Sequence, residues 1–383
     1  MIYKAKKILV WIGWILTTLL VVALINFNLC WSEEQQYGKA HIKIINGVQV
    51  LYLYGTPEEM GEQHGHLMKP EIQTALKDWL RPQFRTDKDW EKAKTDAHKL
   101  AKFIPDDYLR ELKALAKAAE VPYNELLLSF TFTDMRAFEQ VFMHCTAIVA
   151  YGKATRDGSC YLARNFDFPG KGILHNMVIV YHPKGKFSFA SLIWPGMIGP
   201  CTAMNEKGLA LTLNIVMGQP YGDALPQLIL YRMIMENCNS IEEAVRMVQG
   251  AKRSGGWNLT LATKEEGSVV ELNRAAVKVR MAEKEVVYTC NHFVELKGGV
   301  PDFRWSILSS FKSENYGQID LEKIKNLLVQ VSLIPCHSIV MQPKERIMHV
   351  TLTGPKEEFH QLTAQELFEV GPASESDNKA DEK

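Results

Sequence analysis

The residues best suited to chemistry gather between positions 144 and 170 of the sequence. Cys145 stands directly before an apolar stretch, an Asp-Gly turn signal follows at Asp157, and the returning stretch ends at Asp167. If the hairpin folds about Asp157, facing positions add up to roughly 313, and Asp167 lies beside Thr146. The pattern predicts a nucleophile next to a carboxylate. The alternative is a buried cysteine at the start of a core strand, with an Arg-Asp pair at the surface.

The chemistry of Cys145 depends on a base that can take its proton. A free thiol has a pKa of about 8.5, so little thiolate exists at neutral pH. An α-amine with a pKa of about 7.7–8.0 can accept that proton when both groups belong to one residue. Because Cys145 is internal, this requires a cut between His144 and Cys145. The thiol would attack the His144 carbonyl, and water would cleave the resulting thioester.

Several motifs in a fixed order accompany Cys145. They are Cys145-Thr146, ARNFDF (163–168), MNEKGLALTLN (204–214) and TCNHF (289–293), preceded by GTPEEMGEQHG (55–65). Together they resemble the cysteine N-terminal-nucleophile (Ntn) hydrolases, which include the choloylglycine hydrolases, the acid ceramidase group and the acyl-CoA:6-aminopenicillanic acid acyltransferase family. Simple bile-salt hydrolases expose their cysteine by losing only the initiator methionine. The internal position of Cys145 therefore favours the autoproteolytic acyltransferase branch.

The resemblance implies a role for each matching residue. Cys145 is the nucleophile, and Arg164 and Asp167 hold the cysteine and its new α-amine. Asn214 and Asn291 supply side-chain NH₂ groups to an oxyanion hole. Two further candidates lie outside the strict motifs: Arg304, in DFRWSILSS, and His144, which either assists the cut or is only its neighbour in the chain.

One structural requirement follows from the spacing of Arg164 and Asp167. Residues three apart on a regular strand point to opposite faces. If both side chains serve one site, the strand has to end or bend near Asn165, and we expect that it does.

The resemblance implies an α+β fold, a four-layer αββα Ntn sandwich. Residues 31–49 are interpreted as a linker and first strand, and residues 50–144 as a helical pro-region that becomes a small chain after the cut and stays bound. Residues 145–370 form the catalytic domain, and 371–383 a disordered tail. Within the pro-region, Thr56, Pro57 and Glu59 predict a capped helix start.

Residues 1–30 predict a membrane segment, because Lys4, Lys6 and Lys7 precede an apolar run from Ile8 to Leu29. We interpret it as an uncleaved signal-anchor, with the catalytic domain on the extracytoplasmic side. A cleaved signal peptide, giving a secreted or periplasmic protein, is the alternative.

Composition excludes several partner classes. Lys+Arg and Asp+Glu both number 44, and no nucleic-acid motif appears. The cysteines form no disulfide framework or zinc pattern. His64 and His66 are two apart and do not share a helix face, which argues against a metal. The sequence predicts no cofactor.

Three further features lie outside these motifs. Asn258 begins a glycosylation sequon in an apolar strand, which predicts burial, and it is a minor rival for the oxyanion role. Glu271 is interpreted as structural. The segment Trp194-Pro195-Gly196 either borders a substrate pocket or anchors a loop.

The sequence thus predicts an autoproteolytic amidohydrolase or acyltransferase that cleaves a linear amide of a small molecule through an acyl-enzyme on Cys145. One alternative is an N-acyl lipid amidase of the acid ceramidase type. The other is a membrane-anchored binding protein on an inactive version of the fold. The joint presence of Cys145, Asp167, Asn214 and Asn291 argues against the inactive version.

Overall fold

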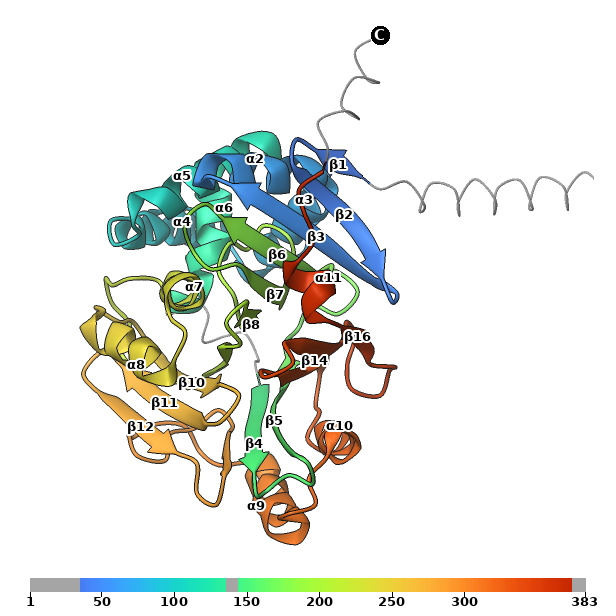
Figure 1. Ribbon diagram of the computed structural model, residues 1–383. Helices are drawn as coiled ribbons and strands as arrows, with labels where there is room; N and C mark the ends of the chain where they lie inside the picture. The colour runs from blue at the N-terminus through green and yellow to red at the C-terminus, as the bar shows by residue number, and fades with distance from the viewer. Residues whose placement is uncertain (1–34, 136–143, 374–383) are drawn as a thin grey trace, which may run out of the picture. The chain divides into compact units, whose positions relative to one another are not determined.

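The computed structural model describes residues 35–135 and 144–373, and from Gln36 onward these residues form one compact unit. They fold into two β-sheets and two groups of helices (Figure 1). The class is therefore α+β, as the sequence predicts.

The larger sheet has ten strands, and all neighbours are antiparallel except β3 and β6, which run parallel. Its strand order is β1-β2-β3-β6-β7-β8-β9-β10-β11-β12. The strands are β1 (Gln36–Tyr37), β2 (Ala40–Ile45), β3 (Val48–Gly55), β6 (Met177–Pro183), β7 (Phe189–Ile193), β8 (Thr202–Asn205), β9 (Ala210–Ile215), β10 (Gly256–Ala262), β11 (Gly267–Asn273) and β12 (Val277–Met281).

The smaller sheet has six strands in the order β13-β4-β5-β14-β15-β16, and it carries Cys145. Its strands are β4 (His144–Gly152), β5 (Gly158–Asp167), β13 (Val286–Thr289), β14 (Pro335–Gln342), β15 (Ile347–Thr351) and β16 (His360–Leu362). Both strands of the predicted hairpin are central in this sheet and buried on both faces, which explains their continuous apolar sequence.

The region before Cys145 is largely helical between residues 57 and 134. Thr56 caps its first helix through the predicted capping box with Glu59. The elements are α2 (Pro57–Leu67), α3 (Lys69–Thr74), η1 (Ala75–Leu80), η2 (Arg81–Gln83), α4 (Asp87–Ala101), α5 (Asp106–Ala118), α6 (Tyr123–Thr131) and η3 (Phe132–Asp134). The helices after Cys145 are α7 (Gln227–Asn237), α8 (Ile241–Gly250), α9 (Phe303–Asn315), α10 (Leu321–Gln330) and α11 (Ala364–Phe368).

Three apolar clusters order these elements into layers. The first joins α2–α8 to one face of the large sheet. The second joins the two sheets and contains Val178 of the large sheet and Leu162 of the small one. The third joins the small sheet, through Ala163 for example, to α9 and α10. The order is helix, sheet, sheet, helix. Because Leu162 and Ala163 face different clusters, even-numbered residues of β5 point between the sheets and odd-numbered residues point toward α9 and α10.

The register of the hairpin differs from the predicted one. Cys145 pairs with Phe166, and Asp167 pairs with His144 rather than with Thr146. The physical reason is the connection: residues 153–157 form a wider loop in place of a tight turn at Asp157. In that loop the Thr155 hydroxyl donates to backbone carbonyls on both sides, with Oγ1–O distances of 3.0 and 2.9 Å.

The expected bend near Asn165 is also wrong. β5 stays paired with β4 and with β14 as far as Asp167. The irregularity falls instead on β14, between Pro335 and His337. Since β5 is regular, Arg164 and Asp167 point to opposite faces, as strand geometry requires.

The predicted membrane segment at residues 1–30 lies outside the described residues, as does most of the predicted tail. Within residues 35–135 and 144–373, none of the helices has the length and apolar character needed to cross a membrane.

Candidate active site

Cys145 is fully buried at the start of β4, and each of its polar atoms is held by a different residue. Its backbone N–H donates to Asn291 Oδ1 at 2.7 Å. Its carbonyl oxygen accepts from Arg304 Nη1 at 3.0 Å, and its Sγ accepts from Arg164 Nη2 at 3.5 Å. All three partners belong to the predicted site, although they come from β5, from the loop after β13 and from α9.

Asn291 lies at the centre of these contacts. Its Oδ1 also accepts from Arg304 Nη2 at 3.1 Å, and its Nδ2 donates to the carbonyl of Ile215 at 2.8 Å. Because the Cys145 N–H and Arg304 both donate, the amide oxygen of Asn291 has to face them. Asn291 therefore holds the nitrogen of the 144–145 bond through its oxygen, while one hydrogen of its NH₂ group binds the Ile215 carbonyl.

Arg304 bridges the residues on both sides of that bond. Its Nη1 donates to the Cys145 carbonyl and to Thr146 Oγ1 at 3.2 Å, and its Nη2 donates to His144 Nδ1 at 3.1 Å. Asp302 caps α9 and binds the same guanidinium. Burial opposes the charge on Arg304, but the hydrogen bond to Asp302 prevails and raises its pKa, so the guanidinium stays charged.

Arg164 reaches the sulfur from the other side, between the two sheets. Its guanidinium is fully buried and donates to the carbonyls of Cys201 and Leu213 at 2.7 and 2.6 Å, and to the hydroxyl of Thr202. A charged donor fixed in this way stabilises negative charge on the sulfur.

Asp167 does not contact Cys145. Its Oδ1 accepts from the backbone N–H groups of Leu333 and Ile334, each at 2.9 Å, in the loop after α10. Its Oδ2 is buried and has no hydrogen-bond partner among the described residues. Burial raises the pKa of this carboxyl, against the opposing effect of the two N–H groups and of Arg304. Asp167 therefore lies opposite His144, the residue before Cys145, and one of its carboxylate oxygens makes no hydrogen bond with the described residues.

Asn214 lies on β9, next to the end of β13. Its Nδ2 approaches the carbonyl of Thr289 at 3.5 Å, and its buried Oδ1 has no hydrogen-bond partner among the described residues. Thr289 pairs with Ala147 of β4, which places Asn214 close to the start of that strand. Of the predicted residues, the structure thus joins Cys145, Arg164, Asn291, Arg304 and His144 by direct contacts, with Asn214 and Asp167 beside them.

The electrostatics of the uncut site disfavour the thiolate. Burial raises the pKa of the Cys145 thiol, and the neighbouring Arg164 only partly offsets this. Burial also lowers the pKa of His144, with Arg304 acting in the same direction. His144 is therefore neutral near pH 7, and its Nδ1 is the acceptor for Arg304. Neither group carries charge in the resting uncut chain.

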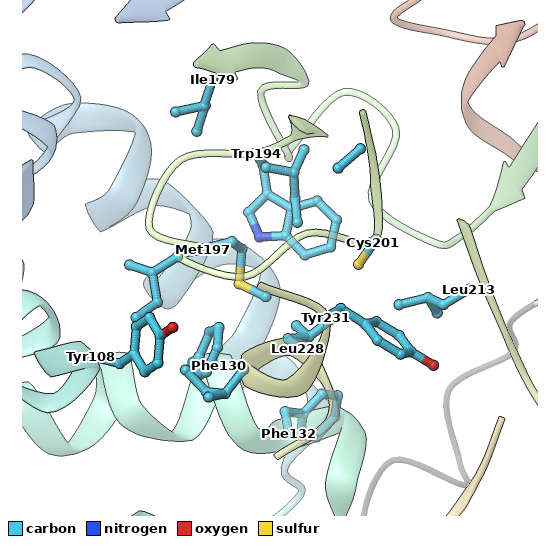
Figure 2. Packing of buried hydrophobic residues seen from close by; sticks show 14 of the residues in the cluster. Tyr108, Phe130, Phe132, Ile179, Trp194, Met197, Cys201, Leu213, Leu228 and Tyr231 are labelled. Atoms are coloured by element: carbon cyan, nitrogen blue, oxygen red, sulfur yellow. The ribbon is translucent and has the colours of Figure 1, made fainter. Parts of the chain in front are cut away.

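A small apolar pocket lies beside residues that contact Cys145 or Arg164. It is lined by twelve residues. They are Trp79, Ser129, Phe132, Thr133, Phe166, Phe168, Trp194, Met197, Cys201, Leu213, Leu228 and Trp257. None of them is charged. Figure 2 shows Trp194, Met197, Cys201, Leu213 and Leu228 packed in this region.

The pocket is tied to the site by direct contacts. Phe166 is the strand partner of Cys145, and the carbonyls of Cys201 and Leu213 bind Arg164. Trp194 lines the pocket, so the segment that the sequence left open between pocket wall and loop anchor does border it. It is an anchor as well, because the Gly196 N–H donates to His64 Nε2 at 3.0 Å.

The remaining candidates have structural partners. Glu271 is structural, as predicted: its carboxylate accepts from three successive backbone N–H groups at 294–296 and from Arg280. His64 is fully buried, and burial lowers its pKa to about 3. Within residues 35–135 and 144–373, no group of three acidic, histidine or cysteine side chains is placed to hold a metal. The six described cysteines are free and buried.

Asn258 is the residue whose importance the sequence did not reveal. It is fully buried, as predicted, yet it is not a free oxyanion donor. Its Nδ2 donates to Thr289 Oγ1, to the Cys290 carbonyl and to the His292 carbonyl, at 2.8, 3.2 and 2.8 Å. The only signal in the sequence was a polar residue in a strand that is otherwise apolar.

Comparison with known proteins agrees with these motifs. The family model described as acyl-coenzyme A:6-aminopenicillanic acid acyl-transferase matches residues 154–325, a segment that begins after Cys145 and includes the other predicted site residues except His144. An uncharacterized protein of Archaeoglobus fulgidus is 25% identical over 345 residues, which are 74% of this chain and 58% of the archaeal protein. The chain thus spans less than two thirds of that relative. Protein dcd1B of Dictyostelium discoideum is 24% identical over 377 residues, 86% of this chain and 72% of its own length.

Solved structures with a partial likeness include two hydrolases. One is the Caenorhabditis elegans ortholog of N-acylethanolamine-hydrolyzing acid amidase, with 18% identity over 52% of this chain and 93% of that chain, and a TM-score of 0.42. The other is a mutant of conjugated bile acid hydrolase from Clostridium perfringens, with 12% identity over 57% and 92% of the two chains, and a TM-score of 0.43. The family match confirms the resemblance of this chain to the acyl-CoA:6-aminopenicillanic acid acyltransferase family of Ntn hydrolases.

Proposed function

We propose that this chain cuts its own 144–145 bond and that the mature Cys145 then hydrolyses, or transfers the acyl group of, a linear amide. One observation carries the proposal. The nitrogen, the oxygen and the sulfur of Cys145 are each held by a residue that the family resemblance assigns to the site: Asn291, Arg304 and Arg164. Any buried backbone N–H and C=O need hydrogen-bond partners. At Cys145 both partners are side chains assigned to the site, and a guanidinium also reaches the sulfur.

The cut proceeds by an acyl shift from nitrogen to sulfur. The Cys145 thiolate attacks the His144 carbonyl carbon, and the C–N bond breaks as the nitrogen takes up a proton and becomes an α-amine. Water then hydrolyses the thioester, which leaves a carboxylate on His144 and returns the thiol to Cys145. Asn291 holds the departing nitrogen throughout, and the charge of Arg164 favours the attacking thiolate.

The mature site acts on a substrate amide in the same way. The new α-amine of Cys145 takes the thiol proton, and the sulfur forms an acyl-enzyme that water or an amine resolves. Asp167 pairs with His144, the residue before the cut, and its unused Oδ2 is assigned to orient the ammonium form. Asn214 and the remaining N–H of Asn291 are assigned as donors to the oxyanion. Losing one such donor typically costs about 10²–10³ in rate.

The pocket favours a substrate whose acyl group is uncharged and apolar. Its walls are dominated by aromatic and aliphatic side chains, and burying a charge there would be costly. This lining also supports the second candidate, an N-acyl lipid amidase, because a fatty acyl chain has the same chemistry. Several wall residues, including Trp79 and Phe132, precede the cut, so the small chain has to remain bound for the pocket to be complete.

Mass analysis of the purified protein tests the proposal. We expect two fragments separated before Cys145 in the wild type and an intact chain for Cys145→Ala. Cys160→Ala is the matched control, because Cys160 is equally buried and lies on the partner strand outside these contacts. An intact wild type whose Cys145 does not react with a thiol-directed amide analogue would refute the proposal and favour a binding protein. An extracytoplasmic location remains a proposal that rests on residues 1–30 alone.

A further inference from the structure

Asn258 binds the loop after β13, the loop that carries Asn291, through several hydrogen bonds. This loop begins at Thr289, the last residue of β13, and carries Asn291. The Asn258 amide lies under it on β10 and donates to acceptors on residues 289, 290 and 292. Asn258 therefore binds residues on both sides of Asn291 in the sequence and leaves the Asn291 side chain free for other contacts.

The carbonyls of residues 290 and 292 both point to one buried NH₂ group. A buried carbonyl needs a donor, and the NH₂ group of one asparagine carries two hydrogens and can serve both carbonyls. With these carbonyls directed at Asn258, the Asn291 side chain is free to extend to the Cys145 nitrogen and to the Ile215 carbonyl. The position of Asn291 thus depends on a residue that never reaches the sulfur.

We propose that Asn258 is a positioning residue for both the self-cleavage and the substrate reaction, and that it acts by fixing the 289–292 loop so that Asn291 meets the nitrogen of Cys145. Asn258 pairs with Asn214 across β9 and β10, and the Asn214 amide approaches the Thr289 carbonyl of the same loop. Asn258 therefore aligns one of the predicted oxyanion donors and lies beside the other. This inference rests on the proposed function of Cys145.

The isosteric substitution Asn258→Asp, which replaces the NH₂ donor by an acceptor, tests the inference. A carboxylate has the same shape but donates no hydrogen bond, so it faces three acceptors as a further acceptor. We expect the rate of the 144–145 cut and kcat for an apolar amide to fall by about 10²-fold, a loss typical of a small misplacement of reacting groups. KM should change little, because Asn258 does not line the pocket.

Asn205→Asp is the matched control. Asn205 is also fully buried on a strand of the large sheet, and its Nδ2 also donates to two backbone carbonyls, those of Met235 and Cys238. These contacts join β8 to α7 and do not touch the site. The control should lower the melting temperature while both rates, measured per folded molecule, stay within about twofold of the wild type.

A milder variant keeps the test informative if Asn258→Asp does not fold. Thr289→Val removes one of the three acceptors at nearly constant volume, and we expect a smaller loss of both rates in the same direction. The inference is overturned if Asn258→Asp or Thr289→Val loses no more rate per folded molecule than Asn205→Asp. That outcome differs from failure of the proposed function, in which the wild type itself stays uncut.

Discussion

Replacing Arg304 by lysine tests whether the site depends on the shape of the guanidinium or only on its charge. The side chain is fully buried and binds His144, Cys145, Thr146 and Asn291, besides Asp302. Lysine keeps the positive charge but offers three donors from one point, whereas arginine spreads five over a plane. An ammonium cannot reach the Cys145 carbonyl and the Asn291 oxygen at the same time as Asp302.

The magnitude follows from the contacts that are lost. A hydrogen bond to a charged group contributes about 1.5–3 kcal/mol, and at least two are lost in Arg304→Lys. Asp302 is about a third exposed, at 32%, and can be rehydrated, so its share is discounted. Two such bonds contribute at least about 3 kcal/mol. We expect most of this, about 2.7 kcal/mol, to appear as misalignment of the 144–145 bond, which is about a 10²-fold slower cut.

The assay is the time course of fragment formation, followed by mass from freshly refolded protein. Arg232→Lys is the matched control: Arg232 is equally buried and binds Glu111 and Glu236, away from Cys145. It should lower the melting temperature and leave the cut within about twofold of the wild type. If Arg304→Lys cuts as fast as Arg232→Lys, the planar guanidinium of Arg304 has no role in aligning the 144–145 bond.

Three further predictions concern charge and the pocket. Because burial raises the pKa of the Cys145 thiol and Arg164 opposes this, the rate of the cut should rise with pH through the neutral range, and Arg164→Met should shift that profile to higher pH; an unshifted profile would contradict the contact. Burial lowers the pKa of His64 from 6.5 to about 3, so between these values the unfolded chain binds a proton that the folded chain does not, and the free energy of unfolding should fall as pH drops from 6.5 toward 3. In His64→Gln, the free energy of unfolding measured in urea should depend less steeply on pH over that range; an equal slope would rule this out. Trp194→Leu should lower kcat/KM for amides with apolar acyl groups by about tenfold without slowing the cut, whereas Trp90→Leu, outside the pocket, should not; equal losses in the two variants would exclude Trp194 from acyl binding.

Local sequence determined the two strands that carry the candidate residues. Cys145 at the start of an apolar stretch and Asp167 at the end of the returning one predicted a nucleophile and a carboxylate on adjacent strands, and the structure places them on the neighbouring strands β4 and β5. The period-2 rule puts Arg164 and Asp167 on opposite faces of a regular strand, and the structure follows this rule rather than the bend that we expected. These features depend on neighbours in the chain, and strand geometry allows few alternatives.

Only the tertiary structure decided the register and the support of the site. The wide loop at residues 153–157 places Asp167 opposite His144, because its turn is set by hydrogen bonds that composition does not specify. The expected bend near Asn165 was wrong because the neighbouring strand β14 absorbs the irregularity instead. Likewise, Asn258 acquires its role from a loop 31 to 34 positions away in the chain. Contacts between distant segments depend on how whole sheets stack, so the sequence could name candidate site residues but not the residues that hold them in place.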